Sequence, residues 1–415
     1  MKNAAIQLLI CFIVLTSLSN PSRGQAIAWT EYNTINSSLP DNSIRCITYE
    51  NDSTVWIGTD FGLAKLVNGQ WTNYNTSNSG LASNSIRSMA IDKSGVKWIG
   101  TFTNGLCSFN DTVWTNINTF NSPLPDDFIR SLAIDTNNVL WAGTTGGLVR
   151  IDSLVTFTIY DQFNSIMNSS NIASMYVDTL TNNKWIGTVN GGLILIDKDT
   201  NFTEFYTGNS GISDNTLLGL DMDATGNLFM ASPANGLLVK LSGFGWVTYN
   251  LVSSNIPTAS LTCLKLDDID QPWIGTADKG LLYKNGSNFI VYDTANSPLT
   301  DVVIQCVNID DSGKVWIGTQ TGGLFILDPS LLTGISSSAS FTNVSVYPNP
   351  ANEVLFYNSP FPTVSCEITD LSGRLLLSES GTSNQIDIHA LSTGLYHVRF
   401  IYEDGNSITR KFLKQ

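Results

Sequence analysis

Hydrophobic and polar positions follow the same order seven times along most of the chain. The clearest mark of each copy is an aromatic residue followed, in most copies, by Ile-Gly-Thr, with Gly-Leu a few residues later. The aromatic positions are Trp56, Trp98, Trp141, Trp185, Phe229, Trp273 and Trp316. They are separated by 42, 43, 44, 44, 44 and 43 residues. A period in the low forties, with four strand-like stretches per repeat, is typical of a β-propeller blade.

Each repeat predicts an inner strand, a turn, the aromatic strand, the Gly-Leu strand and an outer strand. The predicted inner strands are residues 44–49, 86–91, 129–134, 172–177, 217–222, 261–266 and 304–309. The turn often opens with Asp and closes with Gly, as Asp92 and Gly95 do, because Asp binds backbone amides and Gly accepts the left-handed conformation. These aspartates lack the ligand density of a calcium loop. We interpret the aromatic residue as packing between blades and the glycine after it as allowing close approach of the sheets.

The repeat begins out of phase, which predicts how the ring closes. The first outer-strand phrase, near residues 29–32, has no blade before it, and the last inner segments, which end near Asp328, have no outer strand after them. Residues 27–32 are therefore expected to complete the last blade. Closure of this kind removes the exposed sheet edges that favour aggregation.

The period is lost after Asp328. Residues 329–342 are rich in serine and read as a linker. Residues 343–415 contain seven short strand patterns, which indicate a small β-sandwich. The predicted fold is therefore all-β, with a seven-bladed β-propeller at residues 25–328 followed by a small C-terminal β-sandwich.

Residues 1–24 have the pattern of a secretory signal peptide. Lys2 supplies the charged start, residues 6–18 the apolar stretch, and residues 19–24 a small, polar exit. The apolar run is too short to span a membrane comfortably. No transmembrane segment is predicted in the mature chain.

The net charge of −14 arises from the predicted propeller, since the positive leader and the negative tail cancel. An acidic surface repels phosphate backbones, so no nucleic-acid partner is predicted; the acidity is interpreted as an aid to solubility. Cys46, Cys263 and Cys306 share a repeat position that holds small residues in the other blades. We interpret them as buried small side chains, not as disulfides or metal ligands. No metal or cofactor is predicted.

One repeat position carries the candidate binding residues. Arg45, Arg87 and Arg130 occupy it in three consecutive blades, at the start of the inner strand, near the rim of the central channel. The variable loops after Gly-Thr are expected on the same face, and they supply the other candidates, Asp60, Phe61, Phe102, Asn104, Asp278, Lys279 and Gln320. Aromatic faces beside Asn, Asp and Arg are suited to a sugar site. The alternative is that each arginine pairs with a neighbouring aspartate and only neutralises an acidic ring.

The catalytic alternative rests on carboxylates. Both histidines, His389 and His397, lie in the tail, where they read as ordinary strand residues. The predicted propeller therefore has no Ser-His-Asp triad and no histidine metal site. The pairs Asp126-Asp127 and Asp267-Asp268 read as solvated surface. The protein is predicted not to be an enzyme. The alternative is a secreted polysaccharide-acting enzyme, a glycosidase or lyase, whose carboxylates from different blades meet near the axis.

The repeat phrase, D-x-x-G-x-x-W-I-G-T-x-x-G-L, resembles the two-component regulator propeller repeat over residues 26–328. In that family, propellers form the periplasmic sensor portion of membrane histidine kinases, often for oligosaccharides. This sequence shows no membrane helix and no kinase domain, so sensor signalling is not carried over.

The tail resembles the C-terminal sorting domain of the Por (type IX) secretion system. The matching residues are Tyr347-Pro348-Asn349-Pro350-Ala351, then Asp370-Leu371-Ser372-Gly373-Arg374, Leu391 with Gly394-Leu395-Tyr396, and the basic end at Lys411-Phe412-Leu413-Lys414. The resemblance implies that residues 343–415 engage the type IX machinery. The protein would then be secreted or held on the outer cell surface, via the periplasm, where it would bind an oligosaccharide or a surface protein.

Overall fold

The computed structural model describes residues 28–153, 156–199, 201–243, 245–332, 344–359, 363–371, 373–380, 384–402 and 407–415. The predicted signal peptide and most of the predicted linker lie outside these ranges. Within them the chain is built of strands and turns, with one short 3-10 turn, η1 (Pro329–Leu331). None of the described residues forms a helix long and apolar enough to cross a membrane.

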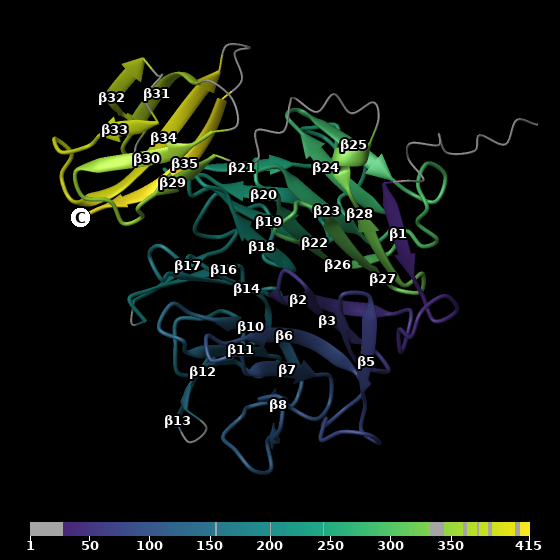
Figure 1. Ribbon diagram of the computed structural model, residues 1–415. Helices are drawn as coiled ribbons and strands as arrows, with labels where there is room; N and C mark the ends of the chain where they lie inside the picture. The colour runs from purple at the N-terminus through teal and green to yellow at the C-terminus, as the bar shows by residue number, and fades with distance from the viewer. Residues whose placement is uncertain are drawn as a thin grey trace, which may run out of the picture.

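Seven four-stranded antiparallel sheets follow one another between Trp29 and Leu327, with their inner strands gathered around a common centre (Figure 1). We number these sheets as blades 1 to 7. Blades 1 to 4 consist of β2 (Ile44–Asn51), β3 (Thr54–Thr59), β4 (Gly62–Val67), β5 (Gln70–Tyr74); β6 (Ile86–Ile91), β7 (Lys97–Thr101), β8 (Leu106–Phe109), β9 (Trp114–Ile117); β10 (Ile129–Ile134), β11 (Leu140–Thr144), β12 (Leu148–Ser153), β13 (Thr156–Tyr160); and β14 (Ile172–Val177), β15 (Lys184–Thr188), β16 (Leu193–Asp197), β17 (Asn201–Phe205).

The remaining blades complete the ring. They consist of β18 (Gly219–Met222), β19 (Leu228–Ser232), β20 (Gly236–Lys240), β21 (Trp246–Tyr249); β22 (Leu261–Leu266), β23 (Pro272–Thr276), β24 (Leu281–Asn285), β25 (Asn288–Tyr292); and β26 (Ile304–Ile309), β27 (Val315–Thr319), β28 (Leu324–Leu327), β1 (Trp29–Tyr32). The all-β fold is as expected. Only the inner strand of blade 5 is shorter than predicted, since it begins at Gly219 and not at residue 217.

The ring closes as the phase of the repeat predicts. Strand β1 pairs antiparallel with β28, with Trp29 opposite Leu327 and Tyr32 opposite Leu324. Trp29 is buried in the core of blades 6 and 7, together with Tyr292 and Phe325. The first and last described strands of the propeller therefore share one sheet, and β28 has no free edge.

The aromatic and glycine positions have the packing roles expected of them. Trp56 is fully buried in a core cluster with Ile86 and Ile99 of the next blade. A Cβ on Gly58 would lie 2.5 Å from Sγ of Cys46 and 2.6 Å from Cγ2 of Ile86. A side chain at that glycine would force neighbouring inner strands apart, so the close contact of blades requires it.

The cysteines at the small-residue position are free thiols, and each residue is half-buried where the sequence predicted a buried one. Each sulfur fills the space above a glycine of the adjacent strand, and a Cβ on Gly275 would lie 2.4 Å from Sγ of Cys263. Burial raises the pKa of the Cys263 thiol to about 11. This thiol therefore behaves as a small apolar side chain.

The C-terminal domain packs two sheets against each other beside blade 5 (Figure 1). One contains β29 (Ser345–Tyr347), β30 (Val354–Asn358) and β33 (Gln385–Asp387), and the other contains β31 (Thr363–Thr369), β32 (Leu375–Ser380), β34 (Gly394–Tyr402) and β35 (Ser407–Lys414). Their shared core includes Tyr357, Phe400 and Phe412. All seven predicted strands are present.

Of the two histidines that were expected to be strand residues, only His397 lies in a strand. His389 lies in a turn after β33, where its ring nitrogen Nδ1 is 2.7 Å from Oδ1 of Asp387. His397 is in β34 but is buried beside the turn of blade 5, and burial lowers its pKa. Arg410 of β35 adds a second contact with the propeller, because its Nη1 donates to the carbonyl of Asp268, 3.3 Å away.

Candidate functional site

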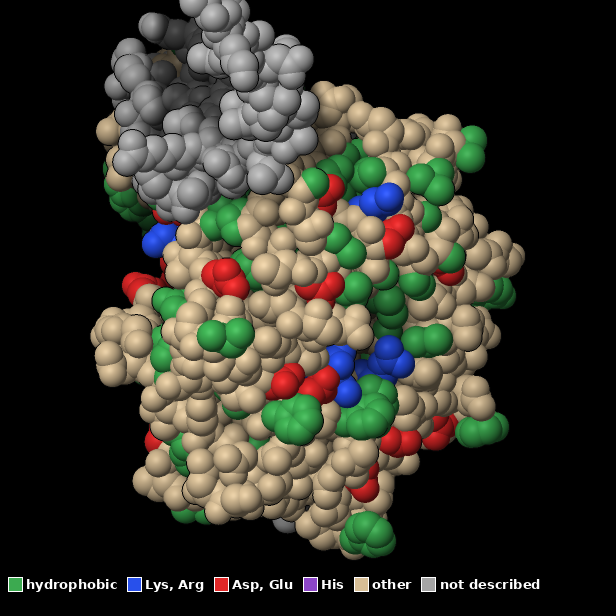
Figure 2. Space-filling view, turned by 90° about the vertical axis from the view of Figure 1, so that its right-hand side faces the viewer, with side chains coloured by type: hydrophobic (Ala, Val, Ile, Leu, Met, Phe, Trp, Pro, Cys, Tyr) green, Lys and Arg blue, Asp and Glu red, His purple; other side chains and the backbone are tan. Residues whose placement is uncertain are grey.

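The three arginines lie at one end of the propeller. Each is the second residue of its inner strand, β2, β6 or β10, and the loops after the second strand of each blade emerge at the same end. We call this end the channel face. Figure 2 looks onto it and shows a group of basic side chains near its middle, beside carboxylates and hydrophobic side chains.

Arg45 is held by hydrogen bonds on both sides. Its Nη2 and Nε donate to Oδ2 of Asp60 at 2.5 and 3.0 Å, and its Nη1 donates to Oε1 of Gln305 of blade 7 at 2.7 Å. Although burial favours the neutral carboxyl, hydrogen bonds from Arg45 and Ser43 hold the pKa of Asp60 below its ordinary value. Arg45 fits the alternative in which each arginine only neutralises a neighbouring aspartate, because its guanidinium is paired with Asp60.

Arg87 shares the same carboxylate. Its Nη1 lies 3.0 Å from Oδ1 of Asp60, and its guanidinium sits over the ring of Phe102, 4.7 Å from the centroid. Its Nε is buried and has no hydrogen-bond partner among the described residues. Desolvation, followed by the charge of Arg45, lowers the pKa of Arg87. The side chain therefore retains an unused donor and only a shared counter-charge.

Arg130 has no carboxylate partner within the described part of the chain. Its Nη1 donates to Oδ1 of Asn171, 3.0 Å away, and its guanidinium lies 5.5 Å from the ring centroid of Phe128. Desolvation alone lowers its pKa. Phe128 and Phe102 meet edge to face, with centroids 4.7 Å apart. Arg87, Phe102, Phe128 and Arg130 thus form a continuous row across blades 2 and 3, which we call the arginine–phenylalanine row.

The other predicted residues lie on loops of the same face without joining the row. Phe61 is 66% exposed beside Asp60, and Asn104 accepts a hydrogen bond from the hydroxyl of Thr103. The backbone N–H of Lys279 is bound by Thr276, and that of Gln320 by the carbonyl of Val303. Asp278 lies on the exposed part of its loop. Among the described residues, the structure joins Asp60 and Phe102 to the arginines and leaves Phe61, Asn104, Asp278, Lys279 and Gln320 apart.

Phe128, Asn171 and Gln305 contact the arginines but were not predicted. The repeat position just before the predicted inner strand holds Ser43, Ser85, Phe128, Asn171, Thr216, Ser260 or Val303, according to the blade. Phe128 is the one aromatic residue in this column. Aligning the seven repeats at this position would have identified Phe128 as a candidate from the sequence.

The carboxylate pairs of the catalytic alternative are parts of turns. Asp126 accepts the N–H of Phe128 at 2.6 Å, and Asp127 accepts the N–H of Thr119 at 2.8 Å. Asp267 accepts the N–H groups of Ile269 and Gln271, and burial raises its pKa to about 6. The expectation of a solvated surface is therefore wrong for Asp267. Its carboxylate instead holds the turn between β22 and β23.

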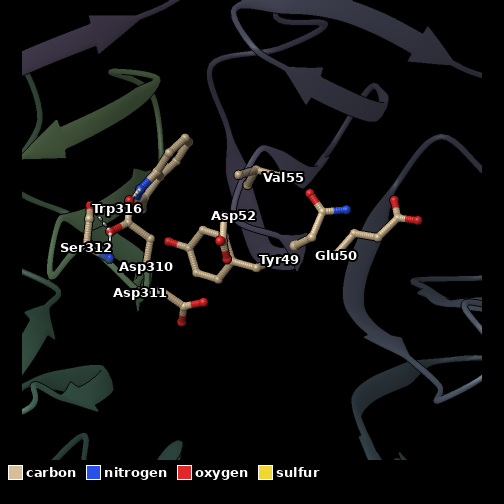
Figure 3. A pocket seen from close by; sticks show the side chains of 9 residues that line it. Tyr49, Glu50, Asp52, Val55, Asp310, Asp311, Ser312 and Trp316 are labelled. Atoms are coloured by element: carbon tan, nitrogen blue, oxygen red, sulfur yellow. Dashed lines mark hydrogen bonds between the residues drawn. The ribbon is translucent and has the colours of Figure 1, made fainter.

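A pocket of about 450 Å³ lies at the opposite end of the inner strands, between blades 7 and 1 (Figure 3). Its lining includes Tyr49, Glu50, Asp52, Asp310 and Asp311. A hydrogen bond to Asp52 and the charge of that group raise the pKa of Asp311. The described residues contain no group of three or more His, Cys, Asp and Glu side chains placed to hold a metal ion. We take the channel face as the candidate site because it brings two arginines and two aromatic rings together.

At the same end of the propeller, side chains bridge three other seams, those between blades 2 and 3, 3 and 4, and 5 and 6. Side-chain oxygens of Asn138, Asn182 and Asp270 each accept a backbone N–H from the turn of the preceding blade, at 2.8, 2.9 and 3.0 Å. At the seam between blades 7 and 1, the carboxylates of Asp52 and Asp311 face each other instead. The seam that holds the pocket thus lacks the bridge that these three seams have.

Two family models match separate parts of the chain. Residues 345–415 match the secretion system C-terminal sorting domain, and residues 38–61 and 123–146 match the two component regulator propeller. The chain thus combines two component regulator propeller repeats with a sorting domain. The sorting domain indicates type IX export to the cell surface or beyond it. No curated protein sequence matches the chain.

Solved structures share the fold at low sequence identity. The extracellular domain of what is described as a hybrid two component system from B. thetaiotaomicron is 18% identical, with a TM-score of 0.63, over 93% of this chain and 57% of that one. PorZ, described as an essential bacterial surface component of the type-IX secretion system of Porphyromonas gingivalis, is 18% identical, with a TM-score of 0.56, over 90% of this chain and 60% of that one. Virginiamycin B lyase from Staphylococcus aureus is 14% identical, with a TM-score of 0.59, over 72% of this chain and 98% of that one. The chain spans less than two thirds of the first two proteins.

Proposed function

We propose that this exported propeller is a binding module that recognises a glycan through its channel face. The observation that carries the proposal is the arginine–phenylalanine row. It combines two guanidinium groups with two aromatic rings on one face, and Phe102 is 42% exposed there. Aromatic rings that stack on sugar faces, beside polar groups that fix orientation, are the usual elements of a carbohydrate site.

The position of the row also supports binding from the channel side. The repeat position that holds arginine in blades 1 to 3 holds Ala173, Leu218, Thr262 and Gln305 in blades 4, 5, 6 and 7. Arginine and aromatic groups are therefore concentrated on one side of the channel mouth. A one-sided arrangement provides a surface for a ligand, whereas a purely structural ring of charges would be distributed evenly.

The catalytic alternative has less support on this face. Asp60 is the carboxylate that contacts the row, and it is bound by Arg45, Arg87 and Ser43. A carboxylate paired in this way is a weak base, because both charge and hydrogen bonds favour its ionised form. The proposal is therefore a binding function.

A glycan array probed with the purified full-length protein tests the proposal. We expect a set of related oligosaccharides to bind, and Phe102→Ala to weaken the best of them about threefold to tenfold, through loss of ring contact. Phe120→Ala is the matched control, since Phe120 is 96% exposed and lies on an outer-strand loop outside the row. Absence of any glycan ligand, or equal effects of the two substitutions, would contradict the proposal.

A further inference from the structure

The charges of the row are unbalanced, and the imbalance lies at blades 2 and 3. Arg45 and Arg87 both bind Asp60, so one carboxylate serves two guanidinium groups. Arg130 adds a third positive charge, with only the amide oxygen of Asn171 as its hydrogen-bond partner in the described chain. A protein of net charge −14 thus keeps an excess of positive charge at one point of its channel face.

One buried, unpaired donor lies at the same place as this excess. Nε of Arg87 is buried without a partner, and Phe102 and Phe128 cover guanidinium faces on the same stretch. Desolvated guanidinium groups without a full counter-charge are unfavourable, and an oxyanion bound at the accessible atoms of these groups relieves the excess positive charge. Arginine suits such a ligand better than lysine because its planar fork binds two oxygens at once.

From this geometry we infer that the channel face selects acidic glycans, with the carboxylate or sulfate group of a sugar residue bound at Arg130 and the adjacent side of Arg87. The inference rests on the proposed glycan function and adds the chemical class of the ligand. Arg45 has a different role, because Asp60 and Gln305 already bind its guanidinium nitrogens. Arg130 is thus the specificity residue, and Arg45 holds the rim of blade 1.

Calorimetry with three matched probes tests the inference. The probes are a galacturonic acid oligomer, its methyl ester and a sulfated galactose oligomer of equal length, and the protein is the full chain. We expect at least one acidic probe to bind more tightly than the ester, with affinity that falls as salt is added. Arg130→Ala should weaken that acidic probe about tenfold or more, as expected for a lost charge-assisted hydrogen bond. The two acidic probes separate carboxylate from sulfate recognition.

Two further variants keep the test decisive. Arg130→Lys retains the charge and serves if the alanine variant does not fold; it should recover only part of the affinity. Arg150→Ala is the matched control, because it removes one positive charge from the same blade at an outer position, where Arg150 pairs with Asp152. It should leave acidic binding unchanged.

The outcomes separate this inference from the function beneath it. Equal binding of the oligomer and its ester, with loss only in Phe102→Ala, would keep glycan binding and overturn acidic selectivity. Acidic binding that is indifferent to Arg130 would also overturn the inference. Failure of every glycan to bind would reject the proposed function together with the inference.

Discussion

The indole nitrogen of Trp141 donates a hydrogen bond to Oδ2 of Asp135, 3.1 Å away, across the first turn of blade 3. Oδ1 of the same carboxylate accepts the backbone N–H groups of Asn137 and Val139 in the turn. Nζ of Lys184, in blade 4, lies 3.2 Å from Oδ2. Trp98 with Asp92, Trp316 with Asp310 and Trp56 with Glu50 repeat the indole contact. In blades 2, 3 and 7 the aspartate six positions before the tryptophan thus fixes the turn and the ring together.

Replacement of Asp135 by alanine should destabilise the protein strongly. The substitution leaves the indole N–H and two turn amides unpaired, and it removes one of the two carboxylates that bind the buried Lys184. We expect the free energy of unfolding to fall by about 3 to 5 kcal/mol, measured with denaturant. Asp92→Ala is the control, since it loses the same turn and indole contacts but binds no lysine among the described residues. Equal losses in the two variants would show that Lys184 contributes nothing through Asp135.

The pH dependence of stability should carry a contribution from Asp267. Burial raises the pKa of this carboxyl from 3.8 to about 6 in the folded protein. A group with a raised folded pKa contributes stability that is present below pH 3.8 and is lost as the pH rises through about 6. We expect the stability difference between wild type and Asp267→Asn to change by about 2 kcal/mol between pH 4 and pH 7. Asp268→Asn alters the exposed neighbour and should show no such change; a pH-independent difference for Asp267→Asn would refute the assignment.

Closure by β1 predicts that Trp29 matters as much as a central core residue. Its side chain packs against Tyr292, with ring centroids 6.0 Å apart, and lies in the core of blades 6 and 7. Trp29→Ala should cost about 3 to 5 kcal/mol and lower the melting temperature by about 5 to 10 °C. Thr30→Ala, on the exposed side of the same strand, should melt with the wild type. A Trp29 variant with an unchanged melting temperature would contradict the closed ring.

The repeat made the propeller and its closure predictable, because seven copies show the same order of apolar, glycine and turn positions. It placed Arg45, Arg87 and Arg130 at one height, but it did not show which of them shares Asp60. That depends on how the loop after each Gly-Thr folds back, and the same position holds Asp60 in blade 1, Phe102 in blade 2 and Gln320 in blade 7. Asp267 shows the same limit, since its sequence context reads as an exposed turn whereas packing of blade 6 buries the carboxyl.

The tail motif Tyr347-Pro348-Asn349-Pro350-Ala351 is hydrogen-bonded to the last residues of the sequence, a contact that we call the clasp. Asn349 accepts the N–H of Leu413 at 2.9 Å, Ala351 donates to the carbonyl of Leu413 at 2.8 Å, and Gln415 donates to the carbonyl of Ala351 at 2.9 Å. The motif near the start of the sorting domain therefore holds the last three residues in place. This contact joins two sequence signals that lie far apart along the chain.

Loss of this clasp should reduce export without affecting the propeller. Asn349→Ala removes the acceptor of the Leu413 N–H, which costs about 1 kcal/mol, a large share of the stability of so small a domain. We expect a lower fraction of protein outside the cell and more in the periplasm, measured by fractionation, with an unchanged melting transition for the propeller, whose seven sheets lie between Trp29 and Leu327. Asn358→Ala, at the exposed end of β30, should export normally. Equal export of the Asn349 and Asn358 variants would show that the secretion machinery does not depend on the clasped end of the chain.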